Sequence, residues 1–221
     1  MVKKLGCNLD AFSDNLKTSF KHPSSDHNVC VFLDPCHMLK LVRNTLGDKK
    51  SLVDGSDSFI NWHYVDNLHK LQEREELHSG NRLRSAHIAW HKNKMNVRLA
   101  AQLFSESVAT SLEFCSQEGF SEFEHCAATV KFIRIFNQLF DVLTSRNLHG
   151  KDFKSPLQSK NINEMRRFLF EAKQYIMSLR ESRNGKFILH SNRRTGFVGF
   201  CICIDSVLEV YDYLTSMCSL G

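Results

Sequence analysis

The chain has 221 residues, of which 42% are hydrophobic and 24% are charged, as is usual for a folded globular protein. Its formal net charge of +5 permits contact with phosphate groups without demanding it. No apolar run approaches the length that crosses a bilayer, and residues 1–6 carry no secretory core, so we expect an intracellular protein with no membrane partner. The eight cysteines are scattered, which predicts reduced thiols in the core.

The first strongly patterned segment runs from Val29 to Asn44, after loops and one short predicted helix over about 10–20. An apolar, β-branched run over 29–33 predicts a buried strand. Pro35 suits the first turn of a helix, and an apolar face follows at helical spacing: Met38, Leu41, Val42 and Leu46. Lys40, Arg43 and Asn44 are predicted to project away from that face.

Asp34 lies between this strand and this helix, and two interpretations of it stay open. A carboxylate at the positive end of a helix dipole stays ionised and can hold a divalent cation. Aspartate is also a good N-cap residue, and a structural cap is the simpler interpretation.

The middle of the chain has helical periodicity almost throughout. Apolar residues three and four apart predict four long amphipathic helices, with charged residues on their other faces. These helices are expected over about 60–78, 87–117, 123–147 and 162–183. Long helices joined by short links predict a helical bundle-like unit.

The end of the chain changes pattern again. The β-branched and aromatic run Gly196–Ile204 predicts a strand or extended chain. Asp205-Ser206 is predicted to cap a last helix that runs to about Met217. A helical block therefore lies between two strand–helix patches. The predicted class is mostly α, with a helical insertion in an α/β domain. The turn-rich segment Asp54–Ser58 is predicted to mark one junction between them.

The segment Leu33-Asp-Pro-Cys-His-Met-Leu-Lys-Leu-Val-Arg-Asn44 resembles the region around the second catalytic aspartate in P-element-type transposases, including the THAP-domain transposases. The resemblance covers nearly the whole chain. It continues through Leu68–Gln72, His91–Ala101, Phe132–Arg134, Leu139–Asn147 and Thr195–Phe200. In that family an RNase H-like nuclease is split by a mostly helical insertion that binds GTP.

This resemblance implies three units. Residues 1–56 would be the C-terminal part of the first half of an RNase H-like domain, 57–192 the helical GTP-binding insertion, and 193–221 the return towards the RNase H-like domain. The family cleaves and joins DNA in the nucleus with two metal ions held by three carboxylates. Asp34 would be the single remaining catalytic carboxylate and Mg²⁺ ligand. No strand–aspartate pattern precedes it, and the surroundings of Glu209 do not match the third acidic motif.

The resemblance also points to a guanine site. Guanine offers N1–H and N2–H₂ side by side, and one carboxylate can accept both hydrogen bonds. The resemblance places this carboxylate at Asp141, with Phe140 near enough to contact the base and Lys92 and Lys94 as base or phosphate contacts. Thr144 stands where the family pattern has asparagine, which puts nucleotide affinity in doubt. The simpler interpretation makes Asp141 an exposed helix residue and the lysines a solvated face.

Three functions follow from these observations. The first is a fragment or domesticated copy of such a transposase, which binds GTP and, in the full-length parent, transposon DNA, but lacks a complete catalytic triad. The second is a helical interaction scaffold that has lost nucleotide binding. The third is a nuclease whose partner chain supplies the missing carboxylates; self-association stays open.

Two further patterns predict no metal site. His87 and His91 are four residues apart but lack a third ligand at a fixed spacing, so they are predicted to be polar surface residues. Cys201 and Cys203 would share one face of a strand, and without a second pair at zinc-finger spacing they predict core packing.

Overall fold

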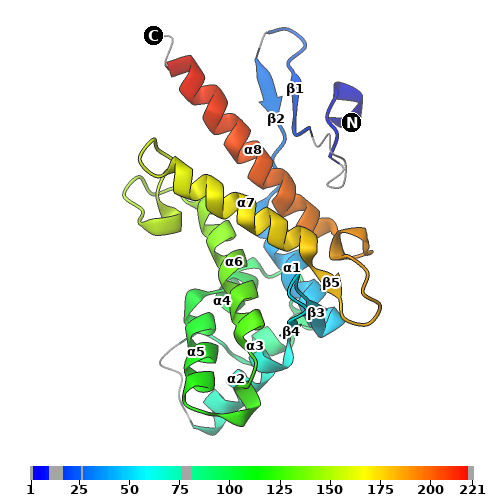
Figure 1. Cartoon of the computed structure of the whole chain (residues 1–221), viewed down its shortest axis with the longest axis vertical. Coiled ribbons are helices and arrows are strands. Elements are labelled where there is room, and N and C mark those ends of the chain that lie inside the picture. Colours follow the sequence, from blue (N-terminus) through cyan, green and yellow to red (C-terminus); the bar gives the residue numbers. More distant parts are fainter. Residues whose placement is uncertain (1, 10–16, 26, 76–80, 219–221) are drawn as a thin grey trace.

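The computed structural model is mostly helical, as the sequence predicts (Figure 1). It describes residues 2–9, 17–25, 27–75 and 81–218. The α-helices in these residues are α1 (Pro35–Lys49), α2 (His63–Arg74), α3 (Ser85–Ile88), α4 (Val97–Leu103), α5 (Glu106–Gln117), α6 (Ala127–Thr144), α7 (Ile162–Ser178) and α8 (Thr195–Cys218). Short 3₁₀ helices are η1 (Val2–Leu5), η2 (Trp90–Lys92), η3 (Ser121–Phe123), η4 (Asp152–Lys154) and η5 (Ile188–His190). None of the described helices is long and apolar enough to span a bilayer.

The described strands are short and antiparallel. Strands β1 (Ser19–Lys21) and β2 (Asn28–Cys30) form a hairpin in which Phe20 is opposite Val29. A second sheet has the order β4–β3–β5, with strands β3 (Ser51–Val53), β4 (Phe59–Asn61) and β5 (Arg180–Glu181). Leu52 pairs with both outer strands, so this sheet joins the segment after α1 to the segment after α7.

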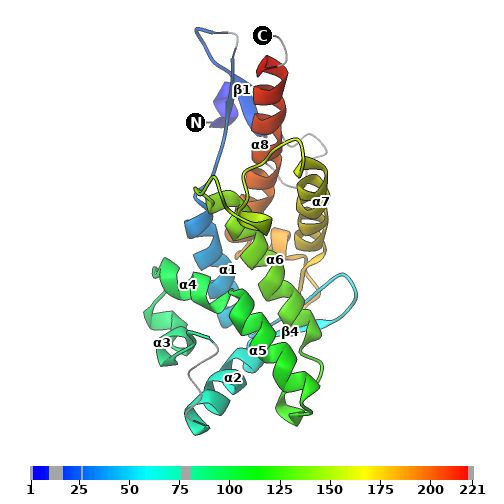
Figure 2. The ribbon, with the colours of Figure 1, turned by 90° about the vertical axis from the view of Figure 1, so that its left-hand side faces the viewer.

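Helix α1 is the central element of the fold. Met38, Val42 and Leu46 are buried, as the helical spacing predicts, whereas the predicted Leu41 is half-buried and Leu39 is fully buried instead. The helix contacts α8, α4 and α6, which lie around it (Figure 2). Arg43 is fully buried as well and Lys40 is 7% exposed, so the prediction that these two residues project away from the buried face is wrong.

Helix α8 includes the segment 196–204, so the prediction of a strand there is wrong. Phe197, Phe200, Cys201 and Ile204 are all at most 1% exposed, because this half of the helix is covered on several sides. A helix buried all round has no amphipathic period, and its composition then resembles that of a buried strand.

The predicted cap pair therefore lies inside α8. Asp205 forms an ion pair with Lys173 of α7 at 2.7 Å, and the Ser206 hydroxyl donates to the Val31 carbonyl at 2.6 Å. These contacts hold α8 against α7 and against the extended chain before α1.

Two glycines let α8 approach α1 closely. A Cβ atom on Gly196 would lie 2.9 Å from Leu41 Cβ and 3.0 Å from the Met38 carbonyl oxygen. A Cβ atom on Gly199 would lie 2.0 Å from Met38 Sδ. The absence of side chains at these two positions is thus what permits the helices to pack at this distance.

Aromatic side chains fill the core between α6, α8 and the end of α4. The Phe136 ring lies 4.7 Å from that of Phe132 and 5.3 Å from that of Phe200, measured between centroids, and 5.8 Å from that of Phe197. Phe104 completes the cluster at 6.0 Å from Phe136. Such tilted and edge-on pairs add stability beyond the area they bury.

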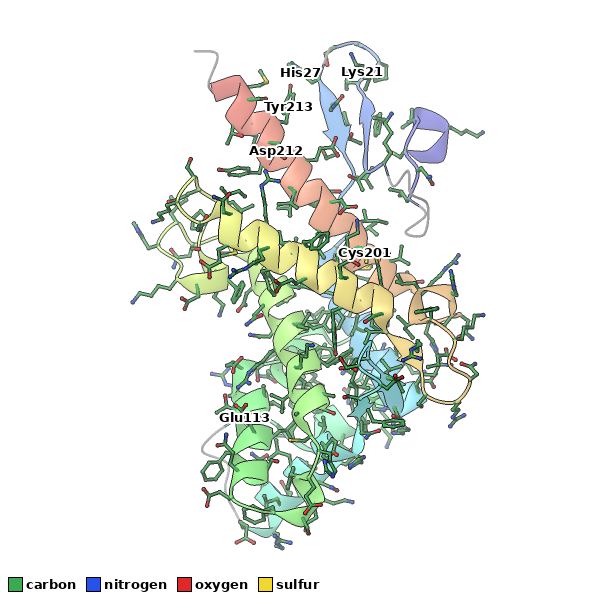
Figure 3. All side chains as sticks on the ribbon, in the orientation of Figure 1. Lys21, His27, Glu113, Cys201, Asp212 and Tyr213 are labelled. Carbon is green, nitrogen blue, oxygen red and sulfur yellow. The ribbon has the colours of Figure 1, made fainter. Side chains whose placement is uncertain are left out.

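The β1–β2 hairpin packs beside the C-terminal half of α8. His27 hydrogen-bonds the hydroxyl of Tyr213, and both are labelled in Figure 3 with Lys21 of the same hairpin. Asp212 pairs with Arg166 of α7 on another side of the helix. Both contacts stabilise the position of a helix end that leaves the main body of the fold (Figure 1).

Several predicted boundaries are corrected. The strand predicted over 29–33 is the shorter β2, and it is not buried as expected, because its residues are exposed or half-buried. Ser19 and Phe20 of the predicted short helix belong to β1, and residues 10–16 lie outside the described residues. The helix expected from residue 60 begins at His63, after β4. The helix expected over 87–117 is divided into α3, η2, α4 and α5. Asn96 and Ser105 cause two of these divisions, because each caps the helix that follows it.

The division into units at 56/57 and 192/193 stays a prediction. Residues 54–58 form the turn between β3 and β4, within one sheet. One continuous core cluster contains side chains from α1, α6 and α8, and so from all three predicted units.

Candidate nucleotide-binding site

Asp141 lies in the last turn of α6, and its side chain is 20% exposed. Burial raises the pKa of this carboxyl, and the nearby Lys154 ammonium opposes the rise. The end of a helix also carries the negative pole of its dipole, which disfavours a carboxylate. A half-buried acid in such a place lowers stability, and perturbed acids of this kind are enriched at functional sites.

The Asp141 carboxylate has one weak partner. Lys154 Nζ of η4 lies 3.6 Å from Asp141 Oδ1, and the lysine side chain is 64% exposed. No other described residue donates a hydrogen bond to this carboxylate. Because exposed ion pairs contribute only about 0–1 kcal/mol, both oxygens can accept hydrogen bonds from a ligand.

Phe140 and Thr144 flank Asp141 on the same helix. Phe140 is half-buried and packs against the hydrophobic core. The Thr144 hydroxyl donates to the Phe140 carbonyl at 2.7 Å, so its proton is used within the helix. Thr144 therefore cannot offer the amide donor and acceptor that asparagine would present there.

Lys92 and Lys94 are exposed and lie around the end of η2, ahead of α4. The Lys94 ammonium is 5.9 Å from the centroid of the Trp90 ring. Among the described residues, no hydrogen bond or ion pair joins either lysine to Asp141. Lys92 thus lies on η2, Lys94 on the chain just after it, and Asp141 on α6; both η2 and α6 contact α1.

Arg43 and Asn44 of α1 hold the lysine segment in place. Arg43 Nη2 donates to the carbonyl oxygens of Asn93 at 2.9 Å and Lys94 at 3.3 Å, and Asn44 Nδ2 donates to Lys94 at 3.2 Å. Burial lowers the pKa of Arg43 to about 10, and its Nη1 has no hydrogen-bond partner. The sequence pattern missed this role, since it predicted only that both residues project away from the apolar face of α1.

Asp34 is an exposed N-cap. Its carboxylate accepts a hydrogen bond from the Cys36 backbone N–H at 2.9 Å, as expected for an aspartate that caps a helix starting with proline. No group of three or more metal-ligating side chains occurs among the described residues. Glu209 accepts hydrogen bonds from Thr18 and Ser19, so it joins α8 to β1.

Of the histidine pair and the cysteine pair, His87, Cys201 and Cys203 are buried in the core and His91 is on the surface. His91 is exposed as predicted, but His87 is 1% exposed and contacts Gln102 and the backbone of Arg84, so the prediction of a surface residue is wrong there. Cys201, labelled in Figure 3, is fully buried, and burial raises the pKa of its thiol to about 12. Cys203 is also buried, with its thiol directed at the Leu33 carbonyl. Both thiols therefore stay protonated at neutral pH.

Comparison with known proteins places these observations in a family. The sequence model of the "TNP-like, GTP-binding insertion domain" matches residues 36–156. DNA transposase THAP9 of Homo sapiens is 34% identical over 216 residues, which are 96% of this chain and 23% of that protein. Transposable element P transposase of Drosophila melanogaster is 32% identical over 140 residues, which are 59% of this chain and 17% of that protein. The chain thus spans about a fifth of the length of these relatives.

A solved structure agrees with the sequence matches. The chain superposes on a Drosophila P element transposase strand transfer complex with a TM-score of 0.78 and 25% sequence identity. The match covers 97% of this chain and 46% of that one. The arrangement of α1 to α8 is therefore shared with a transposase fold.

Proposed function

We propose that this chain, which belongs to the family of P element and THAP9-like transposases with a TNP-like, GTP-binding insertion domain, binds GTP through Asp141. The observation that carries the proposal is the half-buried carboxylate at the end of α6, whose one charged partner is a weakly held lysine. The family description makes GTP the expected nucleotide.

Guanine fits this carboxylate chemically. Its N1–H and N2–H₂ groups would donate to the two oxygens of Asp141, whereas adenine presents an acceptor and a single donor group on the corresponding edge. Hydrogen bonds to an ionised acceptor are about twice as strong as neutral ones. Phe140 would contribute apolar contact to the base. Lys92 and Lys94 would face the phosphates.

The wider activity of the family is also part of the proposal. By analogy with the strand transfer complex, the full-length protein would contact DNA in the nucleus. Asp34 would contribute one ligand to a Mg²⁺ ion there, because a carboxylate oxygen is the ligand that Mg²⁺ prefers. Two-metal catalysis needs further carboxylates, so we do not assign independent catalysis to the described residues.

Calorimetry of the 221-residue chain with GTP and with ATP, in the presence of magnesium, tests the proposal. We expect selective binding of GTP. Asp141→Asn should weaken it about 30-fold, or about 2 kcal/mol, because the amide places a donor against the guanine donors.

Asp57→Asn is a matched control for this experiment. It makes the same chemical change at a residue with φ of 58°, where asparagine is well tolerated, and Asp57 lies in the β3–β4 turn. Its affinity for GTP should equal that of the wild type. A folded wild-type chain that binds neither nucleotide, or equal losses in both variants, would contradict the proposal.

The second candidate function is a helical interaction scaffold. Two observations favour it: the Thr144 hydroxyl is used within α6, and the end of α8 exposes Leu214 and Met217, which are 56% and 49% exposed. A scaffold of this kind predicts no GTP selectivity in the calorimetry above.

A further inference from the structure

We propose that the pocket between α3, α4 and the chain before α3 binds phosphate groups, at a place separate from Asp141. The pocket has a volume of about 410 Å³ and is lined by three arginines, Arg82, Arg84 and Arg98. His87, Asn96 and Gln102 also line it, and none of the described residues that line it carries a carboxylate. It shares no lining residue with the proposed guanine site.

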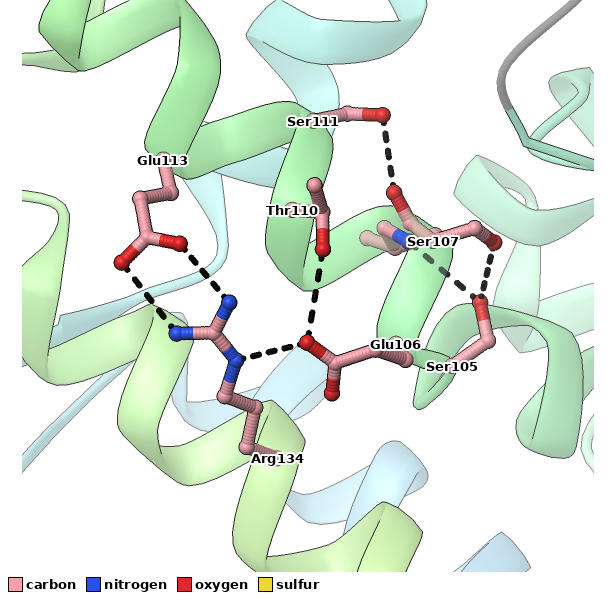
Figure 4. Close-up of polar contacts among 8 residues, drawn as sticks. Ser105, Glu106, Ser107, Thr110, Ser111, Glu113 and Arg134 are labelled. Atoms are coloured by element: carbon pink, nitrogen blue, oxygen red, sulfur yellow. Dashed lines mark hydrogen bonds and ion pairs between the residues drawn. The ribbon is translucent and has the colours of Figure 1, made fainter.

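The three arginines have no acidic partner among the described residues. In the part of the chain that the structure describes, none of them forms an ion pair or a side-chain hydrogen bond. Arg134 on α6 shows the contrast, because it forms two hydrogen bonds with Glu113 and a third with Glu106 (Figure 4). A cluster of guanidinium groups with no acid beside it lacks a counter-charge, which a phosphate would supply.

The chain before α3 directs two of these arginines to the same side. Leu83 is 1% exposed, and its N–H donates to the Asn81 side chain at 2.9 Å, which in turn donates to Ser111 at 3.0 Å. Arg84 has an extended backbone, with φ of −147° and ψ of 168°. Because side chains alternate along an extended chain, burial of Leu83 turns both Arg82 and Arg84 outward into the pocket.

The floor of the pocket is held by a hydrogen-bonded pair, the buried His87 and the half-buried Gln102. His87 Nδ1 lies 3.0 Å from the Arg84 backbone nitrogen and 3.2 Å from the Arg84 carbonyl oxygen, and Nε2 lies 3.2 Å from Gln102 Oε1. We assign the tautomer in which Nδ1 accepts from the Arg84 N–H and the Nε2–H donates to Gln102. This arrangement leaves the amide N–H₂ of Gln102 without a partner among the described residues. The pocket therefore offers guanidinium and amide donors and a neutral imidazole. Guanidinium groups match the oxygens of a phosphate in pairs.

Phosphate can reach such a pocket from two sources. One is the phosphate chain of a free nucleotide, and the other is the backbone of a nucleic acid. Both present the same oxygens to the arginines, and both would bind more weakly as salt rises.

Binding of inorganic triphosphate to the 221-residue chain, measured by calorimetry at low salt, tests the inference. We expect saturable binding that Arg84→Gln and Arg98→Gln each weaken about tenfold. Asp141→Asn should leave it unchanged, which separates this site from the guanine site. A triple variant of exposed arginines elsewhere, Arg167→Gln, Arg183→Gln and Arg194→Gln, controls for loss of net charge and should change affinity less than about twofold.

Competition identifies the source. Displacement of triphosphate by GTP but not by a short DNA duplex would assign the pocket to a nucleotide, and the reverse result would assign it to nucleic acid. No triphosphate binding by a folded wild-type chain, or an equal loss in the control triple variant, would overturn the inference.

Discussion

The close contact of α1 and α8 gives a sharp test through Gly196→Ala. The added Cβ would lie 2.9 Å from Leu41 Cβ, 3.0 Å from the Met38 carbonyl oxygen and 3.1 Å from the Val42 nitrogen. Two of these atoms belong to the backbone of α1, so the helices must separate. Overpacking of this kind costs about 1–3 kcal/mol, and the better helix propensity of alanine returns up to about 1 kcal/mol.

We therefore expect Gly196→Ala to lower the free energy of unfolding by about 1–2 kcal/mol. Urea unfolding, followed by circular dichroism, would measure it, with the m-value as the check that compactness is unchanged. Ser216→Ala on the exposed end of α8 is the control and should stay within about 0.5 kcal/mol of the wild type. A Gly196→Ala chain as stable as the wild type would refute the close contact.

Gly199→Ala provides a comparison within the same interface. Its added Cβ would lie 2.0 Å from Met38 Sδ, which belongs to a flexible side chain. Because methionine can change rotamer, the cost should be below about 1 kcal/mol. Met38→Ala should then destabilise the Gly199→Ala chain less than the wild type, because the new methyl group fills part of the cavity. Strictly additive effects would count against this packing.

Three further predictions concern the candidate site. Asp34→Ala should lower the free energy of unfolding by about 1 kcal/mol because the N-cap is lost, whereas Asp34→Asn keeps a capping oxygen and should leave the stability unchanged. If Asp34 binds Mg²⁺, magnesium will raise the melting temperature of the wild type but not that of Asp34→Asn. Arg43→Lys should destabilise the chain by about 1–3 kcal/mol in urea unfolding, because lysine lacks the planar guanidinium fork that donates to Asn44 through Nε and to the two carbonyls through Nη2. A neutral result would contradict the anchoring role. Burial raises the pKa of the Asp141 carboxyl, so the folded state binds its proton more tightly than the unfolded state does. This tighter proton binding stabilises the folded chain fully below the ordinary pKa of 3.8, and the stabilisation is lost as pH rises through the folded pKa. Asp141→Asn should accordingly be more stable than the wild type near neutral pH, with the difference disappearing in acid; a difference that does not vary with pH would exclude this cause.

The sequence alone determined those elements whose periodicity reports burial on one face. Helices α1, α6 and α7 follow directly from apolar residues three and four apart, and Pro35 and Asp34 specify where α1 begins. The mostly α class and the family resemblance also followed from the sequence, because the motif from Leu33 to Asn44 is local.

Tertiary structure decided what local patterns could not. The segment 196–204 is helical because α1 and α7 cover it, and burial on all sides removes the amphipathic signal that identifies a helix. Arg43 is buried because the segment around Asn93, about fifty residues away in the chain, supplies carbonyl acceptors for its guanidinium group. The weak Asp141–Lys154 pair and the convergence of Arg82, Arg84 and Arg98 also depend on contacts between separate elements. Such contacts have no periodicity in the sequence, because the fold alone sets the distance between their partners.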